Sequence, residues 1–151
     1  MTPKLPVSVL VVIHTTALEV LLLERAQRPG YWQSVTGSLD RLDEAPEAAA
    51  LREVGEETGI VAQASMLERT GIVNVFEIYS HWRHRFAPGT THNTEHVFGL
   101  RLPQRVPVTL AHDEHTASLW LPWEEAAAKC FSWSNQDAIR VLARRARAST
   151  A

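Results

Sequence analysis

Three glutamates in the stretch LREVGEETGI, residues 51–60, are the strongest candidates for chemistry in this sequence. Glu53, Glu56 and Glu57 are spaced i, i+3 and i+4, so on a helix all three carboxylates lie on the same side. Like charges at this spacing destabilise a helix by about 0.2–0.5 kcal/mol per pair. Gly55, between them, costs about 1 kcal/mol relative to alanine. When several such local penalties coincide, they indicate a functional site.

A hard divalent cation explains this cluster. Mg²⁺ and Mn²⁺ prefer carboxylate oxygens, keep several waters and are often completed by substrate phosphates. Such an ion screens phosphate charge and activates a water for attack. Gly55 would let a ligand approach the helix closely. The alternative is an acidic face that only meets solvent and pairs with Arg52, and a protein indifferent to EDTA would favour that alternative.

The residues around the cluster match a known signature. Gly37 is followed by Glu44 and, seven residues later, by the run REVGEETGI, which starts at Arg52 and contains Gly59. This pattern resembles the signature of the Nudix hydrolases, G-x5-E-x7-R-E-U-x-E-E-x-G-U, where U is a bulky aliphatic residue. Every fixed position from Glu44 onward matches. Six residues instead of five separate Gly37 from Glu44, which we interpret as a one-residue insertion in the loop of residues 38–43.

The resemblance implies an enzyme with a particular fold and cofactor. Nudix hydrolases cleave a nucleoside diphosphate linked to another moiety, on an α/β fold with a mixed β-sheet in an α/β/α sandwich. The cofactor implied is Mg²⁺, with Mn²⁺ as a substitute. By position, Glu53, Glu56 and Glu57 are implied to be catalytic metal ligands, one of them a candidate general base. Arg52 is implied to orient a glutamate.

Other stretches resemble one branch of this family. Its members remove pyrophosphate from 7,8-dihydroneopterin 3′-triphosphate in folate synthesis and leave the monophosphate. The matching stretches are KLPVSVLVVI, YWQSVTGS, FEIYSHWRHRFAPG, NTEHVF, DEH and SWSNQDAI, at residues 4–13, 31–38, 76–89, 93–98, 113–115 and 132–139. One alternative is a Nudix hydrolase that removes dATP or oxidised nucleotides as a house-cleaning enzyme. Another is a Nudix-fold binding module without catalysis, which the complete set of signature glutamates disfavours.

Carried over by position, this branch implies one further metal ligand and a set of substrate contacts. The further ligand is Glu114, whose neighbours His112, Asp113 and His115 are alternatives. The implied substrate contacts are Lys4, Arg25, Thr36, Phe76, Glu77, Ile78, Tyr79 and Ser132.

Each of these residues has a chemical reason to contact such a substrate, and most also have a purely structural explanation. Lys4 and Arg25 suit phosphate groups, or they are ordinary surface charges. Phe76 and Tyr79 suit stacking on a flat ring, or they pack in a core. Glu77 offers a carboxylate to the donor edge of a pterin. The basic stretch that follows, residues 80–96, fits either a cationic loop over the triphosphate or a strand with one wet face.

The elements that must position these residues alternate between strands and helices. Apolar and β-branched runs predict strands at residues 7–13, 20–23, 32–36, 60–64, 70–79, 94–102 and 117–121, with Gly37 ending the third. One helix is predicted from about Asp43, a candidate N-cap, to Gly59, with residues 51, 54 and 58 on its buried side. Two more are predicted at residues 123–129 and 134–148, the last with Ser134 as its cap.

Composition limits the class of protein. The 151 residues carry a net charge of −2 and are 45% hydrophobic, which predicts one globular domain over residues 1–151. Neither nucleic acid nor membrane is an expected partner; a small-molecule substrate is. The single cysteine, Cys130, and an apolar run too short to span a bilayer predict a cytoplasmic protein. The chain is compatible with a monomer or a small homo-oligomer.

Overall fold

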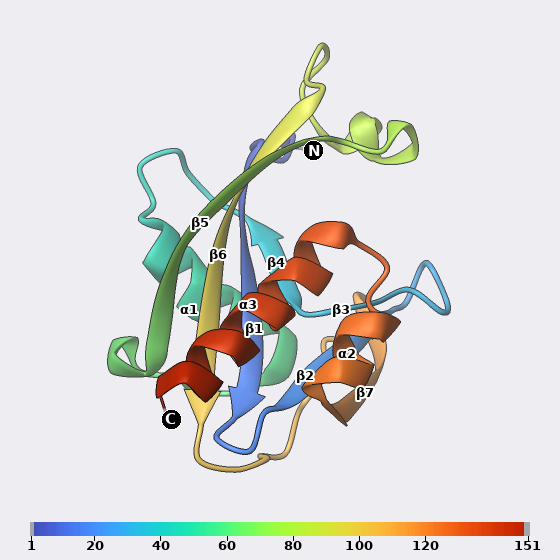
Figure 1. Ribbon diagram of the computed structural model, residues 1–151. Coiled ribbons are helices and arrows are strands. Elements are labelled where there is room, and N and C mark those ends of the chain that lie inside the picture. Colours follow the sequence, from blue (N-terminus) through green and yellow to red (C-terminus); the bar gives the residue numbers. More distant parts are fainter. Residues whose placement is uncertain (1, 150–151) are drawn as a thin grey trace.

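A mixed β-sheet forms the centre of the computed structural model, which describes residues 2–149 (Figure 1). Its strands follow the order β3-β2-β1-β6-β5, with β4 also paired to β1 and β7 to β2. The β1–β6 pair is parallel and the other pairs are antiparallel. The bounds are β1 Val7–Thr15, β2 Glu19–Arg25, β3 Trp32–Gln33, β4 Val35–Ser38, β5 Leu67–Glu77, β6 His92–Leu102 and β7 His115–Pro122.

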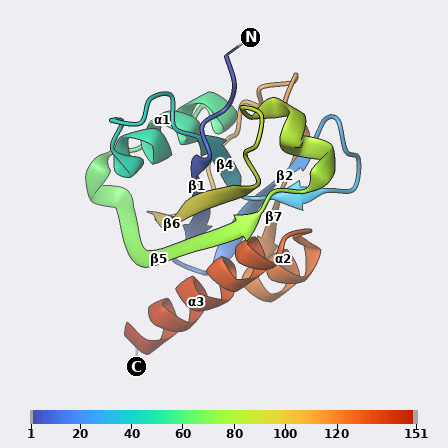
Figure 2. The ribbon, with the colours of Figure 1, turned by 90° about the horizontal axis from the view of Figure 1, so that it is seen from above.

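Helices cover both faces of this sheet (Figure 2). Helix α1 (Pro46–Thr58) lies on one face, and α2 (Trp123–Lys129) and α3 (Trp133–Ser149) lie on the other. Strand β1 is buried on both sides, and its side chains alternate between two cores. Val9, Val11 and Ile13 pack on the α1 side, whereas Leu10 and Val12 pack on the α3 side. The predicted α/β/α sandwich with a mixed sheet is therefore confirmed.

The ends of α1 agree only in part with the sequence prediction. Pro46 starts the helix, but Ala45 is its N-cap and no side chain caps it. The predicted cap, Asp43, is wrong because its carboxylate pairs with Arg41 at 3.0 Å. At the other end Gly59 adopts a φ of 73° and its N–H donates to Gly55, as predicted. Of the predicted buried side, Leu51 is only half-buried.

The start of α3 also differs from the prediction. The helix begins at Trp133, and the Ser132 hydroxyl accepts a hydrogen bond from the Asn135 backbone N–H at 3.3 Å. Ser132 is therefore the cap. Ser134, predicted for that role, lies two residues further along, inside the first turn, and is buried.

Two other local predictions are wrong, and one alternative is resolved. Residues 60–64 form no strand; Val61 is exposed and the chain continues into the short 3₁₀ helix η1 (Ala64–Met66), closed by a capping box with Gln63. Gly37 does not end a strand, because it lies within β4 opposite Val9. The basic stretch fitted either a cationic loop or a strand with one wet face, and its first part forms a second 3₁₀ helix, η2 (Ser80–Arg85).

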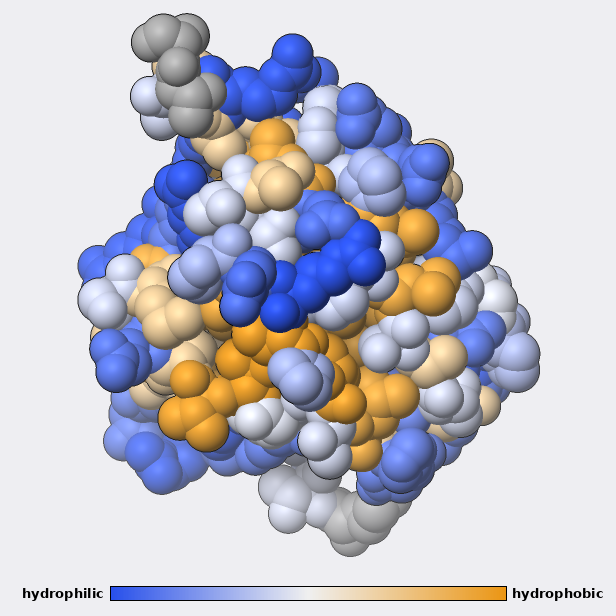
Figure 3. Space-filling model, turned by 90° about the horizontal axis from the view of Figure 1, so that it is seen from below, coloured by the Kyte–Doolittle hydropathy of each residue, from blue (hydrophilic) through white to orange (hydrophobic). Residues whose placement is uncertain are grey.

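The segment between β6 and β7 closes one end of the molecule. It passes beneath the lower ends of the strands, and Val106, Val108 and Leu110 pack against the α1-side core (Figure 1). Seen from this side, hydrophobic residues gather next to a hydrophilic strip (Figure 3). The Thr109 N–H donates to the Thr58 carbonyl at 2.8 Å, which fixes the segment to the end of α1. Within residues 2–149, no helix is both long and apolar enough to cross a membrane.

Candidate active site

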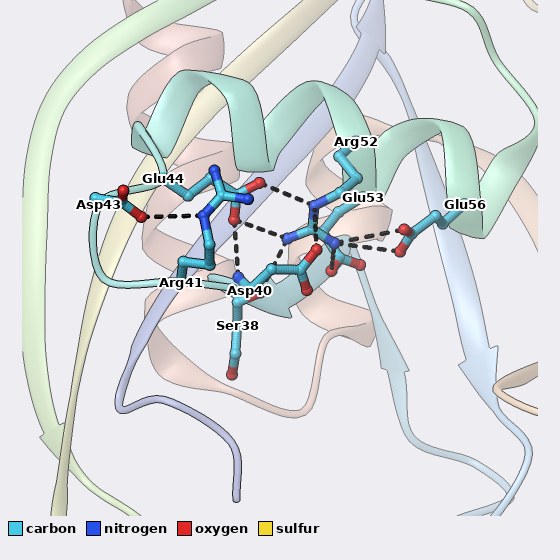
Figure 4. A network of polar contacts seen from close by, with 8 residues as sticks. All are labelled: Ser38, Asp40, Arg41, Asp43, Glu44, Arg52, Glu53 and Glu56. Carbon is cyan, nitrogen blue, oxygen red and sulfur yellow. Dashed lines mark hydrogen bonds and ion pairs between the residues drawn. The ribbon is translucent and has the colours of Figure 1, made fainter. Parts of the chain in front are cut away.

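Arg52 lies at the centre of a network that joins α1 to the loop before it (Figure 4). Its guanidinium donates to both carboxylate oxygens of Glu44, at 3.0 and 3.1 Å, and to the Ser38 carbonyl at 3.2 Å. The hydrogen bonds to Glu44 raise the pKa of Arg52 further above its usual value and lower that of Glu44. Glu44 also accepts the Asp40 N–H at 2.8 Å. The loop that holds the extra residue is therefore tied to the helix, and Glu44 orients Arg52.

Glu53 lies between Arg52 and strand β4. Its Oε1 accepts a hydrogen bond from Arg52 at 2.8 Å, and the residue is only 9% exposed. A Cβ atom added at Gly37 would overlap the Glu53 carboxylate. Gly37 is therefore needed for the close approach of a carboxylate to the strand. By contrast, a Cβ at Gly55 would meet only one atom, at 3.9 Å, so that glycine is not crowded within the protein.

The carboxylate of Glu57 is unusual because it is buried and accepts no hydrogen bond within residues 2–149. It is 1% exposed, and neither of its oxygens has a hydrogen-bond partner among the described residues. Burial, reinforced by the nearby Glu53, raises its pKa well above the ordinary value. Burying a carboxylate without a partner is costly. Two buried acceptor oxygens of this kind fit a cation as their ligand.

A second carboxylate and an imidazole lie beside Glu57. Ligand atoms of Glu57, Glu114 and His115 all lie within 4.8 Å of one another. His115 is buried, and its Nε2 is 3.8 Å from Glu57 Oε1. Burial and then repulsion by Arg25 lower the pKa of His115 to about 4, so the ring is neutral at pH 7. Its Nε2 also lies 3.5 Å from Gln33 Nε2. Two carboxylates and a neutral imidazole fit a divalent cation.

The other candidate ligands lie outside this group. Glu56 is exposed, and its carboxylate faces Arg52 at 3.3 Å (Figure 4). His112 and Asp113 are exposed in the loop before β7. The structure thus places the predicted Glu114 beside Glu57, and of its three predicted alternatives it places His115 in the same group.

Positive charge gathers next to these carboxylates. Desolvation lowers the pKa of both Lys4 and Arg25, and repulsion from Arg85 lowers both further. By surface area, however, Lys4 is exposed. Glu114 exerts the opposite influence on both cations. The Arg25 Nε is buried without a hydrogen-bond partner among the described residues. Neighbouring cations that repel one another, with a donor left unpaired, form a site for an anion.

Arg85 and Arg28 also belong to this group of cations, and their position beside it follows only from the fold. Arg85, at the end of η2, donates to Gln27 at 3.2 Å and accepts the Lys4 N–H at 2.8 Å through its carbonyl. Arg28 also repels Arg25. No ion pair joins Lys4, Arg25, Arg28 or Arg85 to a carboxylate in the part of the chain that the structure describes. In the sequence, Arg85 is one of several cations in a basic stretch, and no local pattern marks Arg28.

An aromatic cluster borders the cations. The Arg25 guanidinium lies over the Trp82 ring at 4.8 Å, and Trp82 contacts Tyr79 at 5.3 Å between ring centroids. Tyr79 is 47% exposed and stacks on His81. Of the predicted ring contacts, Tyr79 is therefore well placed to meet a ligand.

The remaining predicted substrate contacts have other partners. Ile78 is buried, and the Glu77 carboxylate is engaged by Arg83. Phe76 is half-buried on β5. The Thr36 hydroxyl donates to the Val9 carbonyl at 3.0 Å, and Ser132 caps α3.

The comparisons with known proteins agree with this arrangement. Residues 4–142 match the family model described as NUDIX domain. The chain belongs to the Nudix family. The network around Arg52 is thus built from the Nudix signature, with the extra loop residue absorbed between Gly37 and Glu44.

Among Nudix proteins, several similar ones share a name. The chain is 47% identical over 139 residues to dihydroneopterin triphosphate diphosphatase of Escherichia coli strain K12, covering 90% of this chain and 91% of that protein. It is 36% identical to the protein of the same name from Haemophilus influenzae, covering 88% and 84%. The solved structure of the E. coli dihydroneopterin triphosphate pyrophosphohydrolase matches with a TM-score of 0.85 at 45% identity, covering 92% and 95%. A Listeria monocytogenes Nudix structure, 20% identical with a TM-score of 0.79, shares the fold.

Proposed function

We propose that this Nudix hydrolase converts 7,8-dihydroneopterin 3′-triphosphate into dihydroneopterin monophosphate and pyrophosphate, as a cytoplasmic enzyme of folate synthesis. The names of relatives at 47% and 36% identity support this substrate. The observation that carries the chemistry is the buried, unpartnered carboxylate of Glu57 beside Glu114 and a group of unpaired cations. Residues 1–151 would form a single Nudix domain whose partner is this small molecule.

The proposed cofactor is Mg²⁺, for which Mn²⁺ would substitute. When bound, the ion neutralises phosphate charge and lowers the pKa of a water. The residues that would hold it are Glu53, Glu57 and Glu114, with His115 beside them. Glu56, also implied by the signature, would coordinate the ion only if its ion pair with Arg52 broke. The two Glu57 oxygens support this assignment, because they are buried and accept no hydrogen bond among the described residues.

The protein itself would supply position and charge. Water attacks phosphorus, the bond to the departing pyrophosphate breaks, and a carboxylate of the cluster accepts the proton of the water. Arg52 would hold Glu53 in place through the 2.8 Å hydrogen bond. Lys4 and Arg25 would bind the triphosphate together with Arg85 and Arg28. The resemblance implies further contacts, and four of them would line the substrate: Thr36, Phe76, Tyr79 and Ser132. The buried Ile78 would support these residues from behind. Glu77 would contact the substrate only after its ion pair with Arg83 breaks.

Product analysis on several substrates tests the proposal. Dihydroneopterin triphosphate, dATP and 8-oxo-dGTP would be compared at equal concentrations with Mg²⁺. We expect the highest kcat/KM on the pterin, with pyrophosphate as the product. A nucleotide turned over far more efficiently than the pterin would replace this proposal with the house-cleaning function. Absence of turnover on all three would indicate a binding module.

A further inference from the structure

The Trp82 ring brings together segments that lie far apart in the sequence. Trp82 belongs to η2, whose yellow-green coil lies beside β2 and the loop after it in Figure 2. The guanidinium groups of Arg25, at the end of β2, and Arg28, in the following loop, lie 4.8 and 5.9 Å from the centroid of this ring. One ring therefore contacts two arginines that come from outside its own segment.

Contact with an aromatic face holds an arginine without the use of a hydrogen-bond acceptor. The attraction comes from the negative face of the ring. Arg25 donates from Nη1 to Gln33 at 3.1 Å, while its buried Nε has no hydrogen-bond partner among the described residues. A carboxylate in place of the ring would take up these donors and cancel the positive charge. The ring therefore suits an arginine whose charge and donors are available to another ligand.

Arg25 and Arg28 are held together although they repel each other. Repulsion by Arg28 contributes to the lowered pKa of Arg25. The attraction of each guanidinium to the Trp82 ring opposes this repulsion, and Arg28 also lies over Tyr31 at 5.6 Å. Within residues 2–149, neither arginine forms an ion pair with a carboxylate. Two neighbouring arginines without a counter-ion fit a phosphate chain that carries several negative charges.

Three other rings fix the orientation of Trp82. Tyr79, His81 and Phe131 contact it at 5.3, 4.7 and 6.0 Å between centroids, with interplanar angles of 71°, 61° and 76°. The Trp82 backbone N–H donates to the Tyr79 carbonyl at 2.9 Å. Phe131 in turn contacts Tyr31 at 4.8 Å. An indole fixed in this way can determine where the two guanidinium groups lie.

We propose that Trp82 is a positioning residue for the polyphosphate, and that its ring holds Arg25 and Arg28 so that their donors meet the phosphate oxygens. The two arginines would bind the anion directly, and Trp82 would act only through them. That the anion is the triphosphate of a pterin rests on the proposed function, whereas affinity for a phosphate chain does not. The alternative is a Trp82 that only anchors η2, to which neither arginine belongs.

Binding of inorganic pyrophosphate in the presence of Mg²⁺, measured by isothermal titration calorimetry, tests the proposal. Trp82→Leu keeps an apolar side chain but removes the aromatic face, and should weaken binding about 10-fold. Trp82→Phe keeps an aromatic face and should bind within about 3-fold of the wild type. Trp123→Leu, the same change at a half-buried tryptophan that packs in the α3-side core, is the control and should bind as the wild type does.

Fluorinated tryptophan at position 82 changes the ring electronically and leaves its shape nearly unchanged. Each added fluorine withdraws electron density from the face of the ring, which weakens the attraction of that face for a cation. Pyrophosphate affinity should therefore fall stepwise from tryptophan to its mono-, di- and trifluoro forms, at an unchanged melting temperature. A ring that anchors η2 only by its shape would give the same affinity in all forms, and this result would overturn the proposal.

A double-mutant cycle with Arg28→Gln shows whether Trp82 acts through the arginine. Arg28→Gln should weaken pyrophosphate binding about 10-fold in the wild type but less than about 3-fold in Trp82→Leu, where the guanidinium is no longer held in place. Equal losses in the two backgrounds would overturn the proposal, as would equal affinities of Trp82→Phe and Trp82→Leu or a wild type that binds no pyrophosphate. Inactivity on dihydroneopterin triphosphate together with the expected binding differences would refute only the proposed substrate.

Discussion

Arg52 and Glu57 show two opposite uses of charge on the same helix. Arg52 is fully engaged, with Glu44, Ser38 and Glu53 around it, and this network fixes the geometry of the site. Glu57 is buried, its oxygens accept no hydrogen bond among the described residues, and its nearest basic group is the neutral His115 ring at 3.8 Å. The Arg52 charge is compensated by groups of the protein itself, whereas the Glu57 carboxylate is suited to a ligand such as a metal ion.

Replacing Glu57 by glutamine should separate activity from stability. Glu57→Gln should lower kcat by more than about 100-fold, because a central metal ligand is lost. In EDTA the variant should unfold at the same or a higher urea concentration than the wild type, since a buried charge without a partner is removed. Glu47→Gln, on the first turn of the same helix, is the control and should change neither value. Full activity of Glu57→Gln would contradict the metal assignment.

Glu95 should make the stability of the fold depend on pH. Its folded pKa is raised above the ordinary value of 4.5, so the folded state keeps this proton to higher pH than the unfolded chain. Stability due to this group therefore falls as pH rises from about 4.5 through the raised pKa. In urea titrations, the free energy of unfolding of Glu95→Gln minus that of the wild type should increase from pH 4.5 to pH 8. This difference should be smallest near pH 4. A difference that shrinks over this range would show that the charged form of Glu95 is the stabilised one.

At the scale of elements, local signals predicted regular structure well and irregular structure poorly. Pro46 and Gly59 bound α1 as expected, and the apolar runs of β1, β2, β5, β6 and β7 all form strands. Residues 60–64 are apolar enough for a strand, but they find no pairing partner, and local hydrogen bonds turn the chain into η1. The η2 segment likewise forms hydrogen bonds with its own neighbours in the chain: Arg83 Nε donates to the Ile78 carbonyl at 3.0 Å.

The candidate site was predictable where it lies on one element and not where elements meet. The spacing of Glu53 and Glu57 on α1 is a property of the local sequence. That Arg25 meets His115 depends on the register of β2 with β7, in which these two residues are paired across a bulge. Arg28 and Arg85 converge only because η2 lies over the loop after β2, and no local pattern encodes that contact.

The two glycines of the signature region should respond in opposite ways to alanine. Gly37→Ala should destabilise the protein and lower activity at least about 10-fold, because the new Cβ displaces the Glu53 carboxylate. Gly55→Ala makes only one ordinary contact, with the Ile60 carbonyl oxygen at 3.9 Å, and should stabilise α1 by up to about 1 kcal/mol through helix propensity. Thermal melts and initial rates check both. A Gly37→Ala variant as active as the wild type would show that the close approach is not needed.

At the scale of the whole molecule, a nearly neutral protein separates its charges into functional regions. The net charge is only −2, yet Lys4, Arg25 and Arg85 lie together beside Glu53, Glu57 and Glu114. The cations and carboxylates come from the N-terminal segment, β2, η2, α1 and the start of β7. The sandwich therefore assembles, on one surface, the charges needed for a polyphosphate and its metal.

Removing Arg85 should weaken the hold on the triphosphate. Arg85→Ala should raise KM about 10-fold and make it less sensitive to salt, because one phosphate-binding charge is lost. The Mg²⁺ concentration for half-maximal rate should stay unchanged. Arg101→Ala, an exposed arginine of β6, is the control and should leave KM unaltered. If the two variants behave alike, Arg85 takes no part in the site.

The most direct measurement of the central claim is the identity of the phosphate released from dihydroneopterin triphosphate, with Mg²⁺ and with excess EDTA. With Mg²⁺ we predict one pyrophosphate for each dihydroneopterin monophosphate, and with EDTA no reaction. Release of orthophosphate, or a rate that EDTA leaves unchanged, would contradict the account.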